Sequence, residues 1–337
     1  MIYEDKIILC EHPLVSAYIF TYNQQNLVRK TIESFLSQEC SFEYEIIICD
    51  DCSKDGTLSV CLEYQRQHPY IIRVIANDKN MGIRGNFINN ILSYSRGKYI
   101  AYCAGDDWWS DKYKLQKQVS FLEVHQEVSM VHSHARIFVE NTNTYSRNLI
   151  GRNRNTFEEN VLTNGVAALT TCFTKKSFLD YVAEIDPISL PFSEDYPMVL
   201  WFSYRTKVCF MEDALCTYRL QTNSLSHTTD KLKIYKGPQD VLDCRLFFIN
   251  KFNIKDEDLI RKVYLSYYLD RLQYAHLLKD TDGIKNTESF FKGNHYYTFF
   301  FLSKIYTVVG RHERLNKMVS LLARFIRKVH PSHRFYI

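Results

Sequence analysis

The stretch Tyr-Ile-Ala-Tyr-Cys-Ala-Gly-Asp-Asp, residues 99–107, is an apolar run that ends in two adjacent carboxylates. Its first five residues are typical of a buried strand, and the glycine and the two acids mark the end of that strand. Two neighbouring carboxylates repel each other unless a cation is present. Asp106 and Asp107 therefore indicate either a site for a divalent cation or the cap of the helix that follows.

Three similar apolar runs precede this stretch, and each is followed by a segment with helical spacing. The runs cover residues 15–20, 44–49 and 71–76, and the helical segments centre on residues 27–36, 57–67 and 87–92. This alternation is typical of βαβ units. We therefore predict a mostly parallel, Rossmann-like sheet of the α/β class, with helices on both faces.

Polar residues follow each of these predicted strands. They are Tyr22-Asn23, Asp50-Asp51, Asn77-Asp78 and Gly105-Asp106-Asp107. Because ligands of parallel sheets bind at the carboxyl ends of the strands, we expect one binding edge. Asp51 could accept a hydrogen bond from the N3–H of uracil, whereas Asp55-Gly56 is explained by a turn and a helix cap. No Gly-x-Gly-x-x-Gly follows the first strand, which argues against a dinucleotide cofactor.

The pattern changes after residue 107. We predict a helix around residues 115–122, a long strand over 128–139, a surface loop over 141–160, a buried segment over 165–173, a helix over 195–204 and one or two short strands over 208–219. From about residue 229 the spacing is helical, over 241–252, 259–278 and 315–329. We therefore expect one domain over 1–228, with halves of about 12–107 and 108–228, and a helical C-terminal region over 229–337.

The net charge of +4 is too small to indicate a nucleic-acid partner. Residues 304–337, however, contain eight Lys or Arg and one acid, Glu313. This basic segment has two interpretations, a helix on an anionic membrane or a core helix with a solvated basic face. The ten cysteines form no disulfide or zinc framework, and no signal segment is visible, so we expect a cytoplasmic protein, peripheral on the inner face of the cell membrane if the first interpretation holds.

Several motifs, taken in order, resemble those of the family 2 glycosyltransferases. They are Val15–Asn23, the opening strand; Glu45–Thr57, the second strand and its loop; Asn80-Met81-Gly82; Ala104–Trp109 with Lys114–Gln118, the metal-binding segment and its helix; Ser193–Tyr196, the Glu-Asp motif; and Tyr218-Arg219 through Ser224 and Ser226. The resemblance covers about residues 12–228, and the C-terminal hundred residues match no family motif. It implies the GT-A fold and an inverting transfer from a nucleotide-sugar.

The resemblance also implies roles for particular residues. Phe20, Tyr22, Asp51, Arg84 and Asp106 would contact the nucleotide; Asp106 and Asp107, with His227 as a further candidate, would hold Mg²⁺ or Mn²⁺; and Asp195, with Glu194 beside it, would be the catalytic base. An inverting transfer needs one carboxylate to remove the proton of the attacking acceptor hydroxyl. Glu194 and Asp195 could instead cap the helix that begins there.

The expected function is transfer of a sugar, UDP-linked, to a hydroxyl of a glycan or of a lipid-linked glycan. One alternative is a nucleotidyltransferase, but residues 21–29 lack the glycine-rich basic loop that it would need. Another is a catalytically inactive sugar-nucleotide-binding or scaffold homologue. Ala104 favours the latter, because it replaces the first acid of the usual Asp-x-Asp motif.

Four further side chains are candidates for ligand contact. Trp108 and Trp109 could stack on a sugar, although at least one is expected in the core. His132 and His134 alternate along the predicted strand over 128–139, so both point to one face. A metal site at this pair would need a third ligand, and the sequence shows none.

Overall fold

The computed structural model describes residues 1–5, 7, 9–221 and 231–309. The chain forms two compact units, one of residues 1–160 and 164–221, the other of residues 161–163 and 222–337. The expected boundary near residue 228 lies outside the described residues. Each unit is considered by itself.

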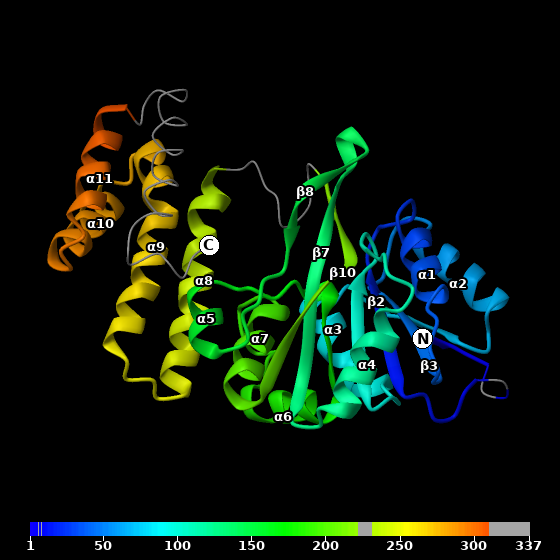
Figure 1. Ribbon diagram of the computed structural model, residues 1–337. Coiled ribbons are helices and arrows are strands. Elements are labelled where there is room, and N and C mark those ends of the chain that lie inside the picture. The colour runs from blue at the N-terminus through cyan, green and yellow to red at the C-terminus, as the bar shows by residue number, and fades with distance from the viewer. Residues whose placement is uncertain (6, 8, 222–230, 310–337) are drawn as a thin grey trace. The chain divides into compact units, whose positions relative to one another are not determined.

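The first unit is built on a ten-stranded sheet with the strand order β1-β4-β3-β2-β5-β9-β7-β10-β6, in which β8 pairs with β7 (Figure 1). Its strands are β1 Ile2–Tyr3, β2 Val15–Thr21, β3 Tyr44–Asp50, β4 Ile72–Ala76, β5 Tyr99–Ala104, β6 Trp108–Trp109, β7 Val128–Val139, β8 Thr144–Ile150, β9 Cys172–Thr174 and β10 Lys207–Leu220. Strands β2, β3, β4 and β5 are parallel, which confirms the predicted βαβ units.

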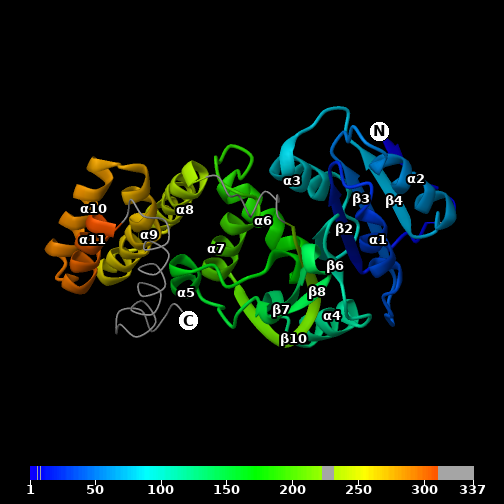
Figure 2. The ribbon, with the colours of Figure 1, turned by 90° about the horizontal axis from the view of Figure 1, so that it is seen from above.

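Helices cover both faces of this sheet (Figure 2). They are α1 Val28–Leu36, α2 Thr57–Gln67, α3 Gly82–Tyr94, α4 Lys114–Val124, α6 Lys175–Ile185 and α7 Asp195–Arg205. Aliphatic residues of β2 and β3 pack against α1 and α2 on one face. On the other face an aromatic cluster joins Phe20 of β2 to Phe87 of α3 and Phe178 of α6. Both faces are thus buried, so the central strands are apolar throughout rather than alternating.

The region after β7 departs from the predictions. Residues 141–160 are not a surface loop, because β8 pairs antiparallel with β7 and α5 begins at Phe157 (Phe157–Leu162). Strand β8 is exposed along most of its length, so it lacks the apolar alternation of a half-buried strand. Instead of one or two short strands, β10 is a single 14-residue strand whose register shifts at Ala214 interrupt the apolar pattern.

A buried ion cluster lies near the amino ends of β2, β3 and β4. Glu45 is 1% exposed, accepts a hydrogen bond from Ser16 Oγ at 2.6 Å, and pairs with Arg73 at 2.9 Å and Arg96 at 2.7 Å. Arg73 also pairs with Glu4 at 2.8 Å. The cluster joins neighbouring strands through charges that have left water, so it depends on each partner being present.

The second unit consists of helices. They are α8 Lys231–Lys251, α9 Glu257–Leu278, α10 Thr281–Gly293 and α11 Tyr297–Val309. The predicted helices over 241–252 and 259–278 are confirmed within α8 and α9, and the one over 315–329 lies outside the described residues. Asp256 caps α9 and Asp280 caps α10, each through its side chain. None of the described helices combines the length and apolar character needed to cross a bilayer.

Candidate active site

The register of the parallel strands brings four strand ends to one edge. Thr21 of β2 pairs with Asp50 of β3, Asp50 pairs with Ala76 of β4, and Phe20 pairs with Ala104 of β5. The chain order runs outward from β2 to β4 and then crosses back to β5 on the other side of β2, so the topological switch point lies between β2 and β5. Ligands of such sheets bind at this point.

Side chains crowd the switch point itself. A Cβ on Gly105 would lie 2.5 Å from Gln24 Oε1 and 2.8 Å from Thr21 Oγ1, so a larger residue at this position would have to displace both side chains. The hydroxyl of Thr31 on α1 donates to the carbonyls of Gly105 at 2.9 Å and Asp107 at 2.6 Å. These contacts fix the backbone that carries the two aspartates.

The loops after β2 and β3 are bonded to each other. Asn23 takes the left-handed conformation (φ 53°), and its Oδ1 accepts the N–H of Lys54 at 2.7 Å. The backbone N–H groups of Asn23 and Gln24 donate in turn to Ser53 Oγ and Thr57 Oγ1. This double connection holds Tyr22 at the surface, where its side chain is 43% exposed. Tyr22 is therefore available to a ligand at the edge.

Asp51 is buried and held by the loop after β4. Its Oδ1 accepts hydrogen bonds from Asn77 Nδ2 and from the backbone N–H of Met81, both at 2.9 Å. Asn77 also donates to Asn86 Oδ1 at 3.0 Å, and Asn86 donates to the Cys49 carbonyl at 3.2 Å. The Asn77 amide, supported by the buried Asn86, orients Asp51, and among the described residues no group donates a hydrogen bond to its Oδ2. The sequence showed Asn77 only as a polar residue at a strand end.

Phe20 lies in the core. Its ring is 3% exposed, stacks on Tyr18 at 5.5 Å and contacts Phe87 at 5.2 Å. The predicted nucleotide contact is therefore closed to its side chain, and only the Phe20 backbone reaches the edge, where the carbonyl accepts the N–H of Gly105. The reason is that β2 alternates its side chains between two buried faces.

Asp106 and Asp107 have different surroundings. Asp107 is 6% exposed, and its Oδ1 accepts the backbone N–H of Arg219 at 2.7 Å. Asp106 is partly exposed. Burial raises the pKa of Asp106, and it raises that of Asp107 well above its usual range, with the charge of Asp106 as the second cause. A cation at this pair would relieve both effects, so the carboxylates suit a divalent cation electrostatically.

Few other groups could complete a metal site. Across residues 1–5, 7, 9–221 and 231–309, no three His, Cys, Asp or Glu side chains gather closely enough to hold one ion. Ala104 supplies no ligand at the end of β5. A cation here would therefore take further ligands from phosphate oxygens and water, which Mg²⁺ commonly does. His227 lies outside the described residues.

Two cations that we did not predict as site residues contact the segment of residues 106–108. The Arg219 guanidinium donates from Nε to the Asp106 carbonyl at 2.8 Å and pairs with Glu140. Lys30 Nζ lies 3.4 Å from the centre of the Trp108 ring, and Arg219 lies over the same ring at 4.9 Å. Burial and the Arg219 charge lower the pKa of Lys30. The Tyr218-Arg219 motif was the signal for Arg219, whereas Lys30 had none.

Glu194 and Asp195 stand at the start of α7, next to the end of β5. Burial first, and then the charges of Asp195 and Glu194, raise the pKa of Tyr102 well above its usual range, so both carboxylates lie near this β5 residue. Burial and the Asp195 charge raise the pKa of Glu194 to about 7. Glu194 makes no side-chain cap bond, while Asp195 Oδ1 accepts its neighbour's N–H at 2.7 Å. The capping interpretation therefore does not account for Glu194.

Arg84 connects the helix after β4 to the Glu194 segment. Its Nη1 donates to the Phe192 carbonyl at 2.7 Å, and its charge partly offsets the rise in the Glu194 pKa. A cavity of about 310 Å³ lies at this junction. It is lined by Met81, Gly82, Ile83, Arg84, Gly85, Ile188, Phe192, Ser193 and Glu194. A small polar molecule in this cavity would lie against Glu194.

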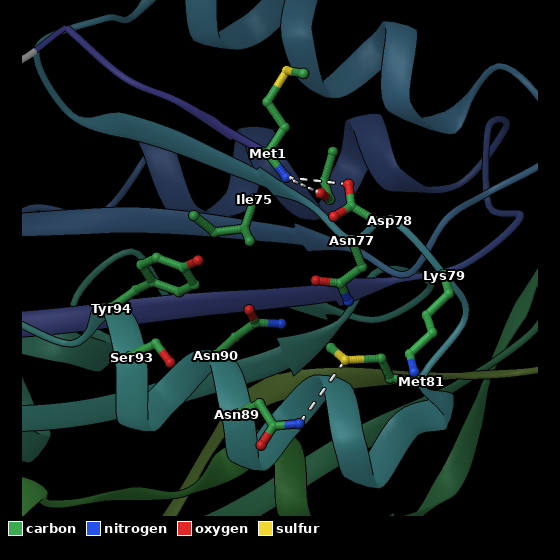
Figure 3. A pocket seen from close by; sticks show the side chains of 11 residues that line it. Met1, Ile75, Asn77, Asp78, Lys79, Met81, Asn89, Asn90, Ser93 and Tyr94 are labelled. Carbon is green, nitrogen blue, oxygen red and sulfur yellow. Dashed lines mark hydrogen bonds and ion pairs between the residues drawn. The ribbon is translucent and has the colours of Figure 1, made fainter.

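A second cavity, of about 280 Å³, lies behind the loop that holds Asp51 (Figure 3). Asn77 and Met81 border it, together with the amides of Asn89 and Asn90 on α3. Asn77 thus stands between this cavity and Asp51, and a change at Asn77 acts on the carboxylate directly.

Three of the remaining candidates are buried. Trp109 stacks on Phe35 at 3.5 Å and is 2% exposed, and Trp108 is also buried, so neither indole presents a free face to a sugar. His132 is fully buried, which lowers its pKa to about 4, and it contacts Asn155 Oδ1 at 3.2 Å. Within the described part of the chain, no third ligand joins His132 and His134.

The sheet order and this acidic edge define a GT-A-type domain. Two solved structures share the fold: Staphylococcus aureus TarS 1–349 in complex with UDP-GlcNAc (TM-score 0.58, 13% identity, 92% of this chain and 91% of that chain) and the mannosyltransferase PcManGT of Pyrobaculum calidifontis in complex with GDP-Man and Mn²⁺ (TM-score 0.55, 12% identity, 94% and 87%).

Residues 16–181 match the family model Glycosyl transferase family 2. Two relatives are the uncharacterized protein Rv1520 of Mycobacterium tuberculosis (28% identical, 66% of this chain and 64% of that protein) and the UDP-Glc:alpha-D-GlcNAc-diphosphoundecaprenol beta-1,3-glucosyltransferase WfgD of Escherichia coli (27% identical, 68% and 85%). The chain thus spans just under two thirds of the length of the first curated relatives that it matches. Residues 16–181 form a glycosyltransferase family 2 domain.

Proposed function

We propose that this protein is an inverting glycosyltransferase that moves a sugar from a nucleotide-sugar, UDP-linked, to an acceptor hydroxyl. The observation that carries the proposal is the placement of two acidic pairs around one strand: Asp106 and Asp107 directly follow β5, and the charges of Glu194 and Asp195 act on Tyr102 within β5. One pair suits a leaving diphosphate with its cation, and the other suits an attacking hydroxyl.

We assign the general base to Asp195. Near neutral pH about half of the Glu194 side chains carry a proton, because the pKa of Glu194 is raised to about 7. The protonated fraction of Glu194 can donate a hydrogen bond to a sugar hydroxyl. Asp195 removes the proton from the attacking oxygen, while negative charge grows on the departing diphosphate.

We assign the metal to Asp106 in preference to Asp107. Asp106 is the more exposed of the two, while Asp107 already accepts the Arg219 N–H. Mg²⁺ or Mn²⁺ bound here would neutralise the charge of the diphosphate. Asp107 holds the end of β10 in place, and Arg219 and Lys30 add positive charge on the same side.

The nucleotide would lie over the ends of β2 and β3. Asp51 Oδ2 is oriented to accept the N3–H of uracil, since Asn77 and Met81 occupy the other oxygen. The exposed Tyr22 ring would pack on the base. These assignments favour UDP, and the related WfgD is named for a UDP-linked donor and a diphosphoundecaprenol-linked acceptor. A glycan or a lipid-linked glycan is therefore the acceptor class that we propose here.

The variant Asp195→Asn tests the base. It should keep UDP binding within about threefold and lose transfer by roughly 10²–10⁴-fold, the usual contribution of a general base. Glu194→Gln is the matched control, because it removes the neighbouring charge and leaves Asp195 in place. We expect a smaller loss in the control. Equal turnover in Asp195→Asn and the wild type would contradict the assignment.

One alternative keeps an observation in its favour. Ala104 replaces an acid that is usual in the family, and no three metal-ligating side chains cluster among the described residues. Both observations suit a homologue that binds a sugar-nucleotide and transfers nothing. Metal-dependent hydrolysis of a panel of UDP-sugars, followed without acceptor, separates the two. Slow hydrolysis that Asp106→Asn abolishes supports the transferase, and binding without hydrolysis across the panel supports the alternative.

A further inference from the structure

The last described helix, α11, exposes an apolar stripe. Tyr297, Phe301 and Ile305 are 50%, 64% and 43% exposed, and their spacing of four residues places them on one face. Single exposed apolar residues are ordinary, whereas three in line on one helix mark a contact surface.

Contacts on the opposite face fix the orientation of α11. Phe299 is fully buried, and its ring lies 5.8 Å from that of Phe291. Ser303 is also fully buried, and its hydroxyl bonds His276 Nε2 and Glu288 Oε1, both at 3.1 Å. Turning the stripe inward would break this packing and both hydrogen bonds. The exposure of the stripe is therefore built into the helical unit.

The sequence that follows the stripe is strongly basic. Lys304 lies beside the stripe and pairs with Glu288. The sequence that follows, residues 310–337, contains seven Lys or Arg and one acid. Aromatic and aliphatic side chains next to a basic segment match an anionic bilayer, whose acyl boundary takes the apolar groups and whose headgroups take the cations. Tyr297 adds a ring with a polar end, a type enriched at this depth.

We propose that the α11 stripe docks this protein onto an anionic lipid bilayer. A second copy of the chain is the weaker candidate, because pairing two stripes would bring two strongly basic segments together. The docking is independent of the proposed transfer reaction. It would hold the enzyme at the surface where a lipid-linked acceptor resides.

Vesicle sedimentation of the full chain tests the proposal. The stripe variant is Tyr297→Ser, Phe301→Ser and Ile305→Ser combined, in which only exposed side chains change. The matched control combines Val124→Ser, Leu149→Ser and Leu179→Ser, three exposed apolar side chains of the first unit. Vesicles contain phosphatidylcholine alone or phosphatidylcholine with phosphatidylglycerol, and far-UV circular dichroism verifies that both variants fold.

We expect the wild type and the control to bind the anionic vesicles more tightly than the neutral ones, and less tightly as salt is raised. The stripe variant should bind roughly tenfold or more weakly, because it loses apolar burial at the membrane surface. Equal binding by the stripe and control variants, or no preference for anionic vesicles, overturns the proposal. The proposal is also overturned if the wild type binds no vesicles but forms a dimer in sedimentation velocity, and the stripe variant does not form that dimer.

The variant Phe301→Trp gives a readout at the stripe itself. The difference between its emission and that of the wild type, which contains three buried tryptophans, should be that of a water-exposed indole in buffer and shift to the blue with anionic vesicles. Emission already typical of a buried indole without vesicles means that the chain covers its own stripe, which overturns the proposal. Neither measurement requires transfer, so failure of the proposed function leaves this test intact.

Discussion

Replacing Asp106 and Asp107 one at a time separates a ligand role from a structural one. In Asp107→Ala the buried N–H of Arg219 loses the acceptor that it has at 2.7 Å. An unsatisfied buried donor costs about 1–3 kcal/mol, so the first unit should lose about that much free energy of unfolding. Asp107→Asn keeps an oxygen at this place and should change stability by less than about 1 kcal/mol. Asp106→Asn should also leave stability nearly unchanged.

The assay can follow the first unit alone. All three tryptophans, Trp108, Trp109 and Trp201, lie in that unit, so their fluorescence during urea unfolding does not report on the helical unit. Calorimetric titration with UDP, with and without Mn²⁺, measures the ligand role separately. Asp106→Asn should weaken Mn²⁺-dependent binding by roughly tenfold to a hundredfold, since a contact to a charged group contributes about 1.5–3 kcal/mol.

The decisive comparison is between the two Asn variants. The metal was assigned to Asp106 because it is the more exposed carboxylate. If Asp107→Asn loses the Mn²⁺ dependence of UDP binding while Asp106→Asn retains it, this assignment is refuted and the buried Asp107 is the metal ligand. If Asp107→Ala is as stable as the wild type, the Arg219 contact does not hold the end of β10, and the structural role fails separately.

Three further outcomes are expected. The native state keeps a proton on Glu194 up to a pH of about 7, above the usual pKa of 4.5, so the free energy of unfolding should fall by at most roughly 3 kcal/mol as pH rises between these values. In Glu194→Gln, urea unfolding should show a flatter dependence of this free energy on pH. An unchanged dependence would exclude Glu194 as the source of the pH effect. Asn77→Ala should weaken UDP binding by roughly tenfold, because Asp51 loses one of its two orienting bonds; calorimetry with Asn89→Ala as the control should show no such loss there. Glu45→Ala should destabilise the first unit by about 3–5 kcal/mol, because it leaves the buried Arg73 short of a partner; a loss under 1 kcal/mol by tryptophan fluorescence would mean that Glu4 and water compensate.

The parallel half of the fold was predictable because its strands are buried on both faces. Continuous apolar runs such as residues 44–49 separate cleanly from helical spacing, and β7 was predicted with its full extent. The strands that follow β7 in the chain were not predicted correctly. Strand β8 is solvated, and β10 is interrupted by register shifts, so neither has a two-residue apolar period. Helix α6 was missed as well.

The candidate site divides in the same way. Asp51, Asp106 and Asp195 could be named because each follows a recognisable element or motif. The core position of Phe20 and the different burial of Asp106 and Asp107 could not be predicted. The local sequence does not show in which direction a side chain at a strand end points. Lys30 and Asn77 enter the site through contacts with distant segments, for which the sequence carries no local signal.

The sequence by itself determined the class of sheet, the edge that carries the acids and the family, because these depend on local hydrophobicity and on short motifs at strand ends. Tertiary structure decided which acid is exposed, which is tied to Arg219 and which lies beside Tyr102. Burial and charge proximity depend on residues far apart in the chain, here 107 and 219. Only the folded chain brings those residues together.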